Sequence, residues 1–427
     1  MNGWAVVIAG SVLVAYGATS RRLSTTVVSG PMVFMVCGLC IGPLGLDLLD
    51  RARDPEVTRA LLEGALVLLL FTDAARIRAR DLRREGFLPL RLLTVGLPAT
   101  MALGWLLAWL LLPGLSVWEL ALVGVILAPT DAALGQQSVS NPRVPALVRG
   151  GLSVESGVND GLALPFFVLA LAAAGESQGH PGIAETFLRA LLLSGAIGCA
   201  AGWTGASVLR WSLKRGWSGS DWRQFLVLAV PAIAYVLCLM GEGSGFIGAW
   251  TAGLAFAVHL SRAPGPEGVL AQQSDPAKST RFTERLGLLL SSLSFMVFGA
   301  VILGPVLEHL TWRPVVYALI SLTVVRMLPV ALALFGAGLR PPSVAFIGWF
   351  GPRGLASLVF GLLAFEEHLP GVTLLGDVVA VTVGMSILLH GASAPFLGDR
   401  YGAWFEGARR ATPNLREDAL APDGAPR

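Results

Sequence analysis

The residues best suited to chemistry lie close together in one apolar part of the sequence. The segment GLSVESGVNDGLALPF holds Glu155, Ser156, Asn159 and Asp160 within two turns of an expected helix. Residues four apart lie on one helix face, so Glu155 aligns with Asn159, and Ser156 aligns with Asp160. Carboxylate, hydroxyl and amide oxygens bind hard cations, and a carboxylate also binds a proton. The pattern therefore predicts a site for a cation, a proton, or each in turn.

A proline interrupts the apolar segment before this one. Pro129, in the string VILAPTDAALG, cannot donate a main-chain hydrogen bond, and its ring clashes with the preceding helical turn. We expect an unwound stretch here, with free carbonyl groups beside Thr130 and Asp131. Discontinuous helices with exposed carbonyls form cation sites at mid-membrane in transporters. The two segments together predict a set of oxygen ligands at one depth.

Two arginines lie inside later apolar segments and need partners there. Arg326 lies in SLTVVRMLPVAL, and Arg353 lies in FIGWFGPRGLASLVFG. A buried guanidinium is costly unless it is paired. We expect Arg326 to pair with Glu155, and Asn159 to hydrogen-bond to the same pair. The GPRG string predicts a second helix break, where Arg353 offsets free carbonyl dipoles or pairs with Asp131.

Another explanation for these polar groups is a structural network that holds two helices together. Such a network explains any single buried carboxylate as well as a functional site does. It explains less well a hydroxyl, an amide and several carboxylates gathered in two neighbouring segments. Ionisable groups at membrane depth are costly, so they are functional candidates by default.

Composition places these segments in lipid. The chain has 427 residues, of which 54% are hydrophobic and 14% are charged, and its formal net charge is +3. The mean hydropathy is +0.68. Soluble domains have roughly 25% charged residues. No basic tail with interleaved aromatic residues indicates nucleic-acid binding, and no stretch between the apolar segments is long enough for a soluble catalytic domain.

Hydropathy predicts about thirteen membrane spans, since a helix needs about 20 apolar residues to cross the hydrocarbon core. The first apolar run has no basic region before it, so we expect a span there and not a cleaved signal peptide. The expected spans are 4–20, 26–46, 59–75, 88–112, 117–135, 151–174, 186–213, 222–241, 243–260, 284–307, 312–337, 343–365 and 372–397.

The distribution of arginine and lysine predicts the orientation, because short cytoplasmic loops are rich in these residues. The loop after the third span is the most basic one, and it should be cytoplasmic. This places the amino terminus outside and the carboxyl terminus inside a bacterial-type inner membrane. The composition of residues 261–283 predicts a flexible linker, and the polar, proline-containing chain after Tyr401 is expected to be a disordered tail.

Four strings together resemble a known family. LAPTDA, SVESGVNDG, VVRMLPV and GWFGPRG are similar to the signature segments of NhaP-type sodium/proton antiporters, in the monovalent cation/proton antiporter superfamily. The resemblance implies an all-α polytopic fold with inverted repeats and two crossing discontinuous helices. It also implies a homodimer in the lipid bilayer, with no cofactor and no soluble partner. The implied parts are dimerisation-domain helices 1–3 in residues 1–86, core ion-transport helices 4–6 in 87–174, linking and dimerisation-domain helices 7–10 in 175–311, core ion-transport helices 11–13 in 312–397, and a cytoplasmic tail in 398–427.

The same resemblance assigns roles to the residues that match its motifs. It implies that Asp160 carries the cation or the proton. The ion would be coordinated further by Ser156, by Glu155 and by the main-chain carbonyl of Thr130. The supporting residues would be Asp131 and Asn159, which hold the site, Arg326, which pairs with Glu155, and Arg353, which stabilises the crossing of the broken helices.

These residues predict secondary active exchange of a monovalent cation, Na⁺ and also Li⁺, for H⁺. Burial disfavours an ionised carboxylate, so a proton can compete with the cation for Asp160. Antiporters with two adjacent aspartates resemble electrogenic carriers, whereas an Asn–Asp pair such as Asn159–Asp160 resembles the electroneutral type. We therefore expect one proton per cation.

Other functions share some of these features. A K⁺/H⁺ antiporter would use the same oxygen ligands, and a cation-coupled symporter would also need a solute pocket. A channel would show polarity along a whole stripe. For an intramembrane enzyme, GEGSGF around Ser244 departs from the GxSG pattern. The five histidines are scattered, mostly at span ends, and we expect each of them at an interface. We expect Asp73 and Asp377 to be structural or entrance charges near the interfaces.

Overall fold

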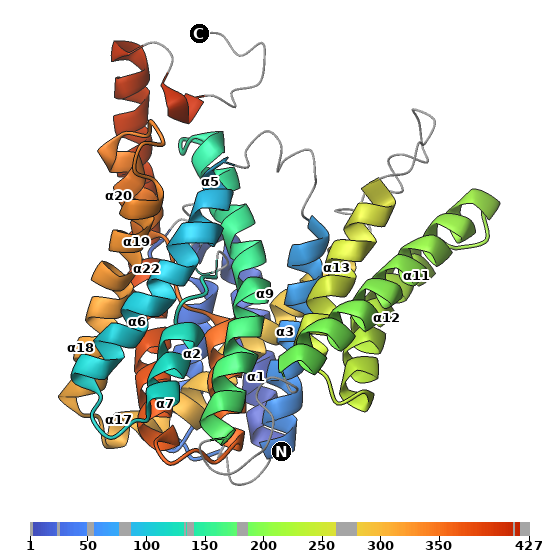
Figure 1. Cartoon of the computed structure of the whole chain (residues 1–427), viewed down its shortest axis with the longest axis horizontal. Coiled ribbons are helices and arrows are strands. Elements are labelled where there is room, and N and C mark those ends of the chain that lie inside the picture. The colour runs from blue at the N-terminus through green and yellow to red at the C-terminus, as the bar shows by residue number, and fades with distance from the viewer. Residues whose placement is uncertain are drawn as a thin grey trace. The chain divides into compact units, whose positions relative to one another are not determined.

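The protein is all-helical in the part of the chain that the computed structural model describes (Figure 1). The described residues are 3–23, 26–48, 55–76, 87–131, 134, 141–176, 187–261, 280–412 and 415–418. Residues 262–279 of the predicted linker at 261–283 and most of the basic loop after the third span lie outside these ranges. The two ends of that linker are helical, since α13 includes Ser261 and α16 begins at Arg281. The all-α fold class predicted from the sequence is confirmed.

Each expected span coincides with a helix or with a run of consecutive helices. Seven of the described helices are long and apolar enough to cross a membrane. Spans four, seven, ten and eleven each contain a π-helical segment, and spans five and twelve are interrupted. The helices are α1 (Gly3–Leu23), α2 (Gly30–Ile41), α3 (Pro55–Arg76), α5 (Phe87–Arg91), α6 (Leu97–Leu111), α7 (Val117–Ile126), α9 (Ala146–Glu176), α11 (Ser194–Arg215), α12 (Ser220–Met240), α13 (Gly245–Ser261), α16 (Arg281–Val297), α17 (Gly304–Glu308), α18 (Trp312–Ile320), α19 (Arg326–Ala333), α20 (Pro341–Trp349), α21 (Leu355–Glu366) and α22 (Val372–Ala411).

The chain divides into two compact units. Unit 1 comprises residues Met1–Arg59, Arg84–Asn159 and Ser292–Arg427. Unit 2 comprises Ala60–Arg83 and Asp160–Ser291. The division falls within α9, which is nevertheless one continuous helix. The functional division into core and dimerisation domains is a separate matter and stays a prediction.

Small residues bring the helices of unit 2 into close contact. A Cβ atom on Gly198 would overlap the carbonyl group of Gly248, and one on Gly202 would overlap that of Ala252. Helices α11 and α13 therefore pack backbone against backbone. This is the usual way for helices to associate in lipid, where burial of apolar surface gives little driving force.

In unit 1 the same device holds the helices around the interrupted spans. Gly104 of α6 faces Gly124 of α7 closely, and the Tyr317 hydroxyl donates to the Gly104 carbonyl at 3.1 Å. Unit 1 also contains a core of buried side chains, most of which come from α5, α9, α19, α20 and α22. Its members include Leu88, Val148, Leu152, Val330, Ile347, Phe350 and Tyr401.

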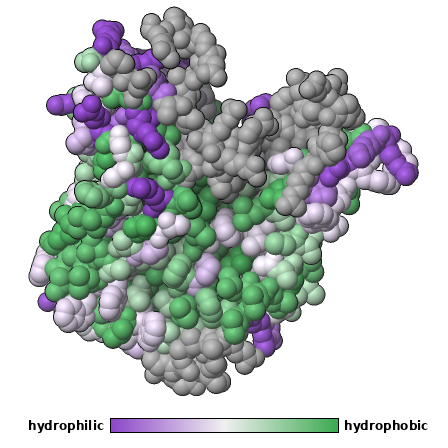
Figure 2. All heavy atoms as spheres, turned by 45° about the horizontal axis from the view of Figure 1, so that its top comes forward, coloured by the Kyte–Doolittle hydropathy of each residue, from purple (hydrophilic) through white to green (hydrophobic). Residues whose placement is uncertain are grey.

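Large apolar side chains also cover the outside of many helices. Figure 2 shows hydrophobic residues over broad areas of the visible face, with strongly hydrophilic residues near its margins. A soluble monomer rarely exposes so much continuous apolar surface. These side chains are therefore expected to face lipid, and they include Trp105, Trp109, Leu110, Trp203, Val236, Leu332 and Phe335.

The last helix departs from the sequence prediction. A disordered tail was expected after Tyr401, but α22 continues to Ala411 (Figure 1). Its 40 residues span about 60 Å, about twice the hydrocarbon thickness. Small and polar residues made the end of this helix look irregular. Packing of Tyr401 on Phe346 of α20, with ring centroids 4.3 Å apart, keeps it helical.

A short segment beyond α22 also packs onto the core. Glu417 is buried, and its carboxylate accepts hydrogen bonds from the Arg340 main-chain N–H at 2.8 Å and from the Ser343 hydroxyl at 2.7 Å. These donors lie at the start of α20, where free N–H groups and the helix dipole favour a negative charge. Arg416 stacks over the Phe87 ring at 4.6 Å. The segment thus caps α20 and touches the start of α5.

We predict that Glu417→Ala lowers the free energy of unfolding by about 2 kcal/mol, because hydrogen bonds to a charged group typically contribute about 1.5–3 kcal/mol. Thermal unfolding of the purified full chain measures the change. The control is Asp418→Ala, which removes only a surface ion pair with Arg409 and should cost about 1 kcal/mol or less. Equal losses in the two variants would show that Glu417 does not act as the cap.

Candidate ion-binding site

The first helix break lies where Pro129 predicts it. Helix α7 begins with a capping box, in which Ser116 and Glu119 satisfy each other's main-chain N–H groups, and it ends at Ile126. Residues 128–131 have no helical structure. The break leaves several carbonyl groups without partners in α7. The residues between Asp131 and Asn141 lie largely outside the described ranges.

The second break joins the first by a main-chain hydrogen bond. Helix α20 ends at Trp349 and α21 begins at Leu355, with residues 350–354 non-helical between them. The Asp131 N–H donates to the Pro352 carbonyl at 2.8 Å. The Ser357 hydroxyl of α21 donates to the carbonyl of Ile126, the last residue of α7, at 2.7 Å. The two interrupted spans therefore satisfy each other's free backbone groups.

Two glycines of the second break are required by close contacts. A Cβ atom on Gly354 would overlap the Asp131 side chain, and one on Gly351 would overlap the Arg326 guanidinium. The GPRG string thus supplies both the interruption and the space for two charged side chains. The Asp131 carboxylate lies 3.5 Å from the Leu355 N–H, at the start of α21, where a helix dipole favours an anion.

Arg353 donates hydrogen bonds to main-chain carbonyl groups at both breaks. Its side chain is completely buried, and Nη1 donates to the carbonyls of Ala128 at 3.1 Å, Gly351 at 3.1 Å and Pro129 at 3.4 Å. The sequence left two partners open, carbonyl dipoles or Asp131. The hydrogen bonds that the described residues make show the carbonyls as the partners.

The predicted pair of Glu155 and Arg326 is present. Two parallel hydrogen bonds join them, Nη1 to Oε1 at 2.6 Å and Nη2 to Oε2 at 2.9 Å. The side chains are only 3% and 2% exposed. This bidentate geometry is the strongest form of such a pair. The two buried charges therefore compensate each other.

Asn159 does not extend that pair as expected. Its Nδ2 donates to the Thr130 hydroxyl at 2.7 Å, and no hydrogen bond to Glu155 or Arg326 occurs among the described residues. The reason is the position of the α7 break, which brings the Thr130 side chain to this turn of α9. Asn159 therefore holds the unwound segment, and its buried Oδ1 has no hydrogen-bond partner within the described ranges.

Asn159 binds the side chain of Thr130, whereas Ser156 binds its main chain. The Ser156 hydroxyl donates to the Thr130 main-chain carbonyl at 2.9 Å. Because α9 is continuous, Asp160 comes one turn later on the Ser156 face, and one of its carboxylate oxygens is shielded from solvent. A main-chain carbonyl, a hydroxyl and the next carboxylate along the helix are the oxygen types that a hard cation binds.

Two buried polar side chains on α22 were not predicted from the sequence. His390 was expected at an interface, but it is 0% exposed, because α22 extends far beyond it. The His390 Nδ1 lies 3.2 Å from the Ser386 hydroxyl oxygen. The same oxygen accepts a hydrogen bond from the main-chain N–H of Arg353 at 2.7 Å. Ser386 and His390 are four apart in an apolar span, the same signal that singled out Ser156 and Asp160. His309 and His368 are exposed near helix ends, as expected, and His180 lies outside the described residues.

This arrangement of breaks and buried charges falls within a known family. The family profile described as "Sodium/hydrogen exchanger, transmembrane" matches residues 8–399. The chain belongs to this family. The sodium/hydrogen exchanger match includes both breaks, both buried arginines and the polar stretch of α9, so these features lie in the shared part of the chain.

Curated relatives agree with the family and with the resemblance drawn from the sequence. The chain is 28% identical over 364 residues to a Na⁺/H⁺ antiporter of Saccharomyces cerevisiae, covering 78% of this chain and 34% of that protein. It is 25% identical over 367 residues to the K⁺/H⁺ antiporter NhaP of Alkalimonas amylolytica, covering 85% and 60%. The chain therefore spans only about a third to three fifths of the length of these relatives.

Solved structures show the exchanger fold. The sodium proton antiporter MjNhaP1 from Methanocaldococcus jannaschii, solved at pH 8, superposes with a TM-score of 0.75 at 21% identity. The match covers 93% of this chain and 99% of that one. The predicted fold of a sodium/proton antiporter, with two interrupted spans, is therefore confirmed.

We predict that removing one member of the Glu155–Arg326 pair destabilises the protein more than removing both. Glu155→Leu leaves a buried guanidinium uncompensated and should cost about 3–5 kcal/mol, as should Arg326→Met, whereas the double variant should cost less than either. Thermal unfolding of the purified chain measures the three changes. Additive losses in the double variant would mean that the pair is not energetically coupled.

Proposed function

We propose that this chain exchanges a monovalent cation, Na⁺ and also Li⁺, for H⁺, and that both compete for Asp160. The observation that carries the proposal is the contact of 2.9 Å between the Ser156 hydroxyl and the Thr130 carbonyl at the α7 break. It places two neutral oxygens together one helical turn before Asp160. Family membership supports the same activity.

The cation would replace a hydrogen bond that is already present. The Ser156 hydroxyl now points its hydrogen at the Thr130 carbonyl. If that hydrogen rotates away, both oxygens present lone pairs to an ion, and the Asp160 carboxylate supplies the charge. Glu155 remains a fixed anion, because both of its oxygens are bound by Arg326. A remaining lone pair on a Glu155 oxygen can still bind the transported ion, while Asp160 is the group that exchanges the proton.

Competition between the ion and the proton is a consequence of burial. A carboxylate shielded from water needs a compensating positive charge, which either a bound cation or a bound proton supplies. The neighbouring Asn159 carries no charge, and both oxygens of Glu155 are bound by Arg326. A single mobile carboxylate therefore supports one proton per cation. The transmembrane potential would then drive no net exchange, although it acts on each moved charge with about 2.3 kcal/mol per 100 mV.

The proposal also includes the setting of the exchanger. We infer a homodimer in a bacterial-type inner membrane, with the amino terminus outside and the carboxyl terminus cytoplasmic. The arginine-rich loops support this orientation. A K⁺/H⁺ exchanger is the second candidate, since the matched relatives include proteins named for each ion and all the proposed ligands are oxygens.

Proton flux in proteoliposomes tests the exchange. Addition of Na⁺ or Li⁺ to vesicles with an acidic lumen should release protons with saturable kinetics, and parallel additions of K⁺ decide between the two candidates. Asp160→Asn should abolish the flux, because a neutral amide does not take up a proton and cannot compensate the charge of a cation. Asp399→Asn, which changes an exposed carboxylate on α22, is the matched control and should retain the flux. Flux that persists in Asp160→Asn would overturn the proposal.

The same vesicles test the stoichiometry. We expect that an imposed membrane potential, set with K⁺ and valinomycin, leaves the Na⁺/H⁺ exchange rate unchanged within error. A potential that drives net Na⁺ movement against equal ion gradients would contradict the one-to-one exchange, while leaving the role of Asp160 intact.

A further inference from the structure

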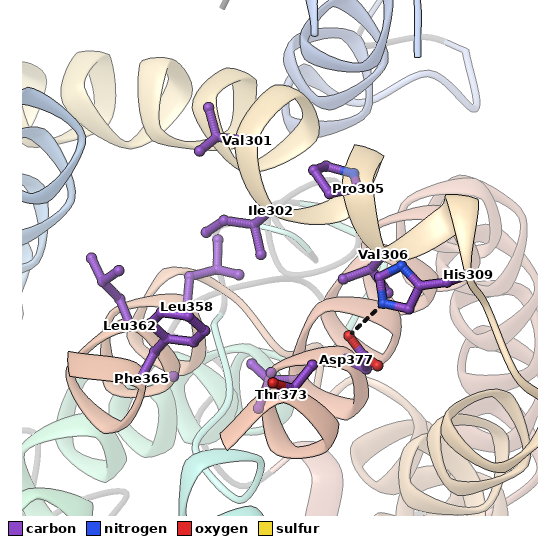
Figure 3. A pocket seen from close by; sticks show the side chains of 13 residues that line it. Val301, Ile302, Pro305, Val306, His309, Leu358, Leu362, Phe365, Thr373 and Asp377 are labelled. Atoms are coloured by element: carbon purple, nitrogen blue, oxygen red, sulfur yellow. Dashed lines mark ion pairs between the residues drawn. The ribbon is translucent and has the colours of Figure 1, made fainter. Parts of the chain in front are cut away.

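Unit 1 contains a cavity that the proposed exchange does not use. It has a volume of about 460 Å³, within the range of about 300–1,000 Å³ typical of sites for small organic ligands. Its walls come from residues 301–309, from α21 and from the start of α22. Figure 3 shows Leu358, Leu362 and Phe365 on one side, and the side chains of His309 and Asp377 together on the other.

The polar end of the cavity carries one dominant charge. The Asp377 carboxylate lies 3.5 Å from His309 Nε2, and the side chains are 18% and 56% exposed, respectively. A neutral imidazole carries no charge, and its exposed ring can turn away from the carboxylate at little cost. The residues that line the cavity include no lysine or arginine. The carboxylate therefore faces a largely apolar space, with the half-exposed His309 ring as its partner among the lining residues.

We propose that this cavity binds a small organic monocation, an ammonium or amidinium group attached to an apolar body. The charged group would pair with Asp377, and the Thr373 hydroxyl one turn earlier offers a further acceptor. The apolar body would pack on Leu358, Leu362 and Phe365. Charge complementarity excludes anions, and burial of apolar surface favours an organic ion over an inorganic one.

An inorganic cation does not fit this cavity for a second reason. Hard cations bind through several oxygens, but the lining side chains offer only those of Asp377 and Thr373. At the α7 break, by contrast, a main-chain carbonyl and a hydroxyl lie together. The two sites thus differ in ligand class, although each contains an aspartate.

An occupant would link helices that come from distant parts of the chain. The cavity touches Val306 in α17, Leu358 in α21 and Asp377 in α22. Helix α21 begins directly after the second break, so a ligand bound here contacts the half-helix that follows the segment containing Arg353. We expect such a ligand to slow exchange without competing with Na⁺. This consequence rests on the proposed function, whereas binding itself does not.

Gly376 offers a way to fill the cavity without disturbing the protein. A Cβ atom at this position meets no atom within 4 Å, and the residue lines the cavity. A leucine side chain here would therefore occupy the ligand's space. By comparison, a Cβ atom on Gly361 would press on Val379 at 3.1 Å, so a substitution there would strain the wall.

Calorimetric titration of the purified full chain with benzylammonium tests the proposal. We expect saturable binding, with benzyl alcohol and benzoate at least tenfold weaker. Asp377→Asn should weaken benzylammonium binding tenfold or more, and Gly376→Leu should abolish it. Asp399→Asn, which changes a carboxylate elsewhere on α22, should bind as the unmodified chain does.

Several results would overturn the assignment. Equal binding of benzyl alcohol would show a purely hydrophobic pocket, of the kind that a lipid chain fills. Unchanged binding in both Asp377→Asn and Gly376→Leu would place the ligand elsewhere. Loss of binding in Asp160→Asn would mean that benzylammonium occupies the exchange site. Because binding is measured without transport, failure of the exchange proposal would leave this test intact.

Discussion

Main-chain carbonyl groups that a broken helix releases inside a bilayer must find donors, because no water is present in the hydrocarbon region to supply them. In this protein two interrupted spans meet this constraint together. The Asp131 N–H binds the Pro352 carbonyl, and Arg353 binds carbonyls on both sides of the crossing. The Thr130 carbonyl is the one that a movable hydroxyl satisfies. The carbonyl group that the break releases is thus also the one that the proposed exchange assigns to the ion.

The buried charges divide into fixed and exchangeable groups. Glu155 and Arg326 compensate each other through two short hydrogen bonds, and such a pair costs more to separate than to keep. Arg353 is committed to carbonyl dipoles, and Asp131 lies at the start of α21. Asp160, one turn beyond Ser156, is the carboxylate that the proposed mechanism assigns to the transported ion or proton. A single exchangeable carboxylate is also the physical basis for expecting no net charge movement.

Support for the crossing extends well beyond the residues that contact it. Ser386 on α22 accepts the Arg353 N–H, and His390 lies one turn further along the same helix. At the opposite end of α20, Glu417 caps the helix from a segment that is distant in sequence. The half-helix that leads to the second break is therefore held at both ends. Precise placement of oxygen atoms for an ion requires this kind of rigidity.

The sequence by itself determined the spans, both breaks and the presence of charge at membrane depth. These features are local, since apolar length, Pro129 and the GPRG string act on the backbone wherever the chain lies. The pairing of Glu155 with Arg326 could also be predicted, because few opposite charges are available in lipid. Tertiary structure decided the other partners. Arg353 binds carbonyl groups, Asn159 binds Thr130, and His390 is buried. These contacts depend on which helices become neighbours, and the spacing of residues along the chain does not determine the neighbours of a helix.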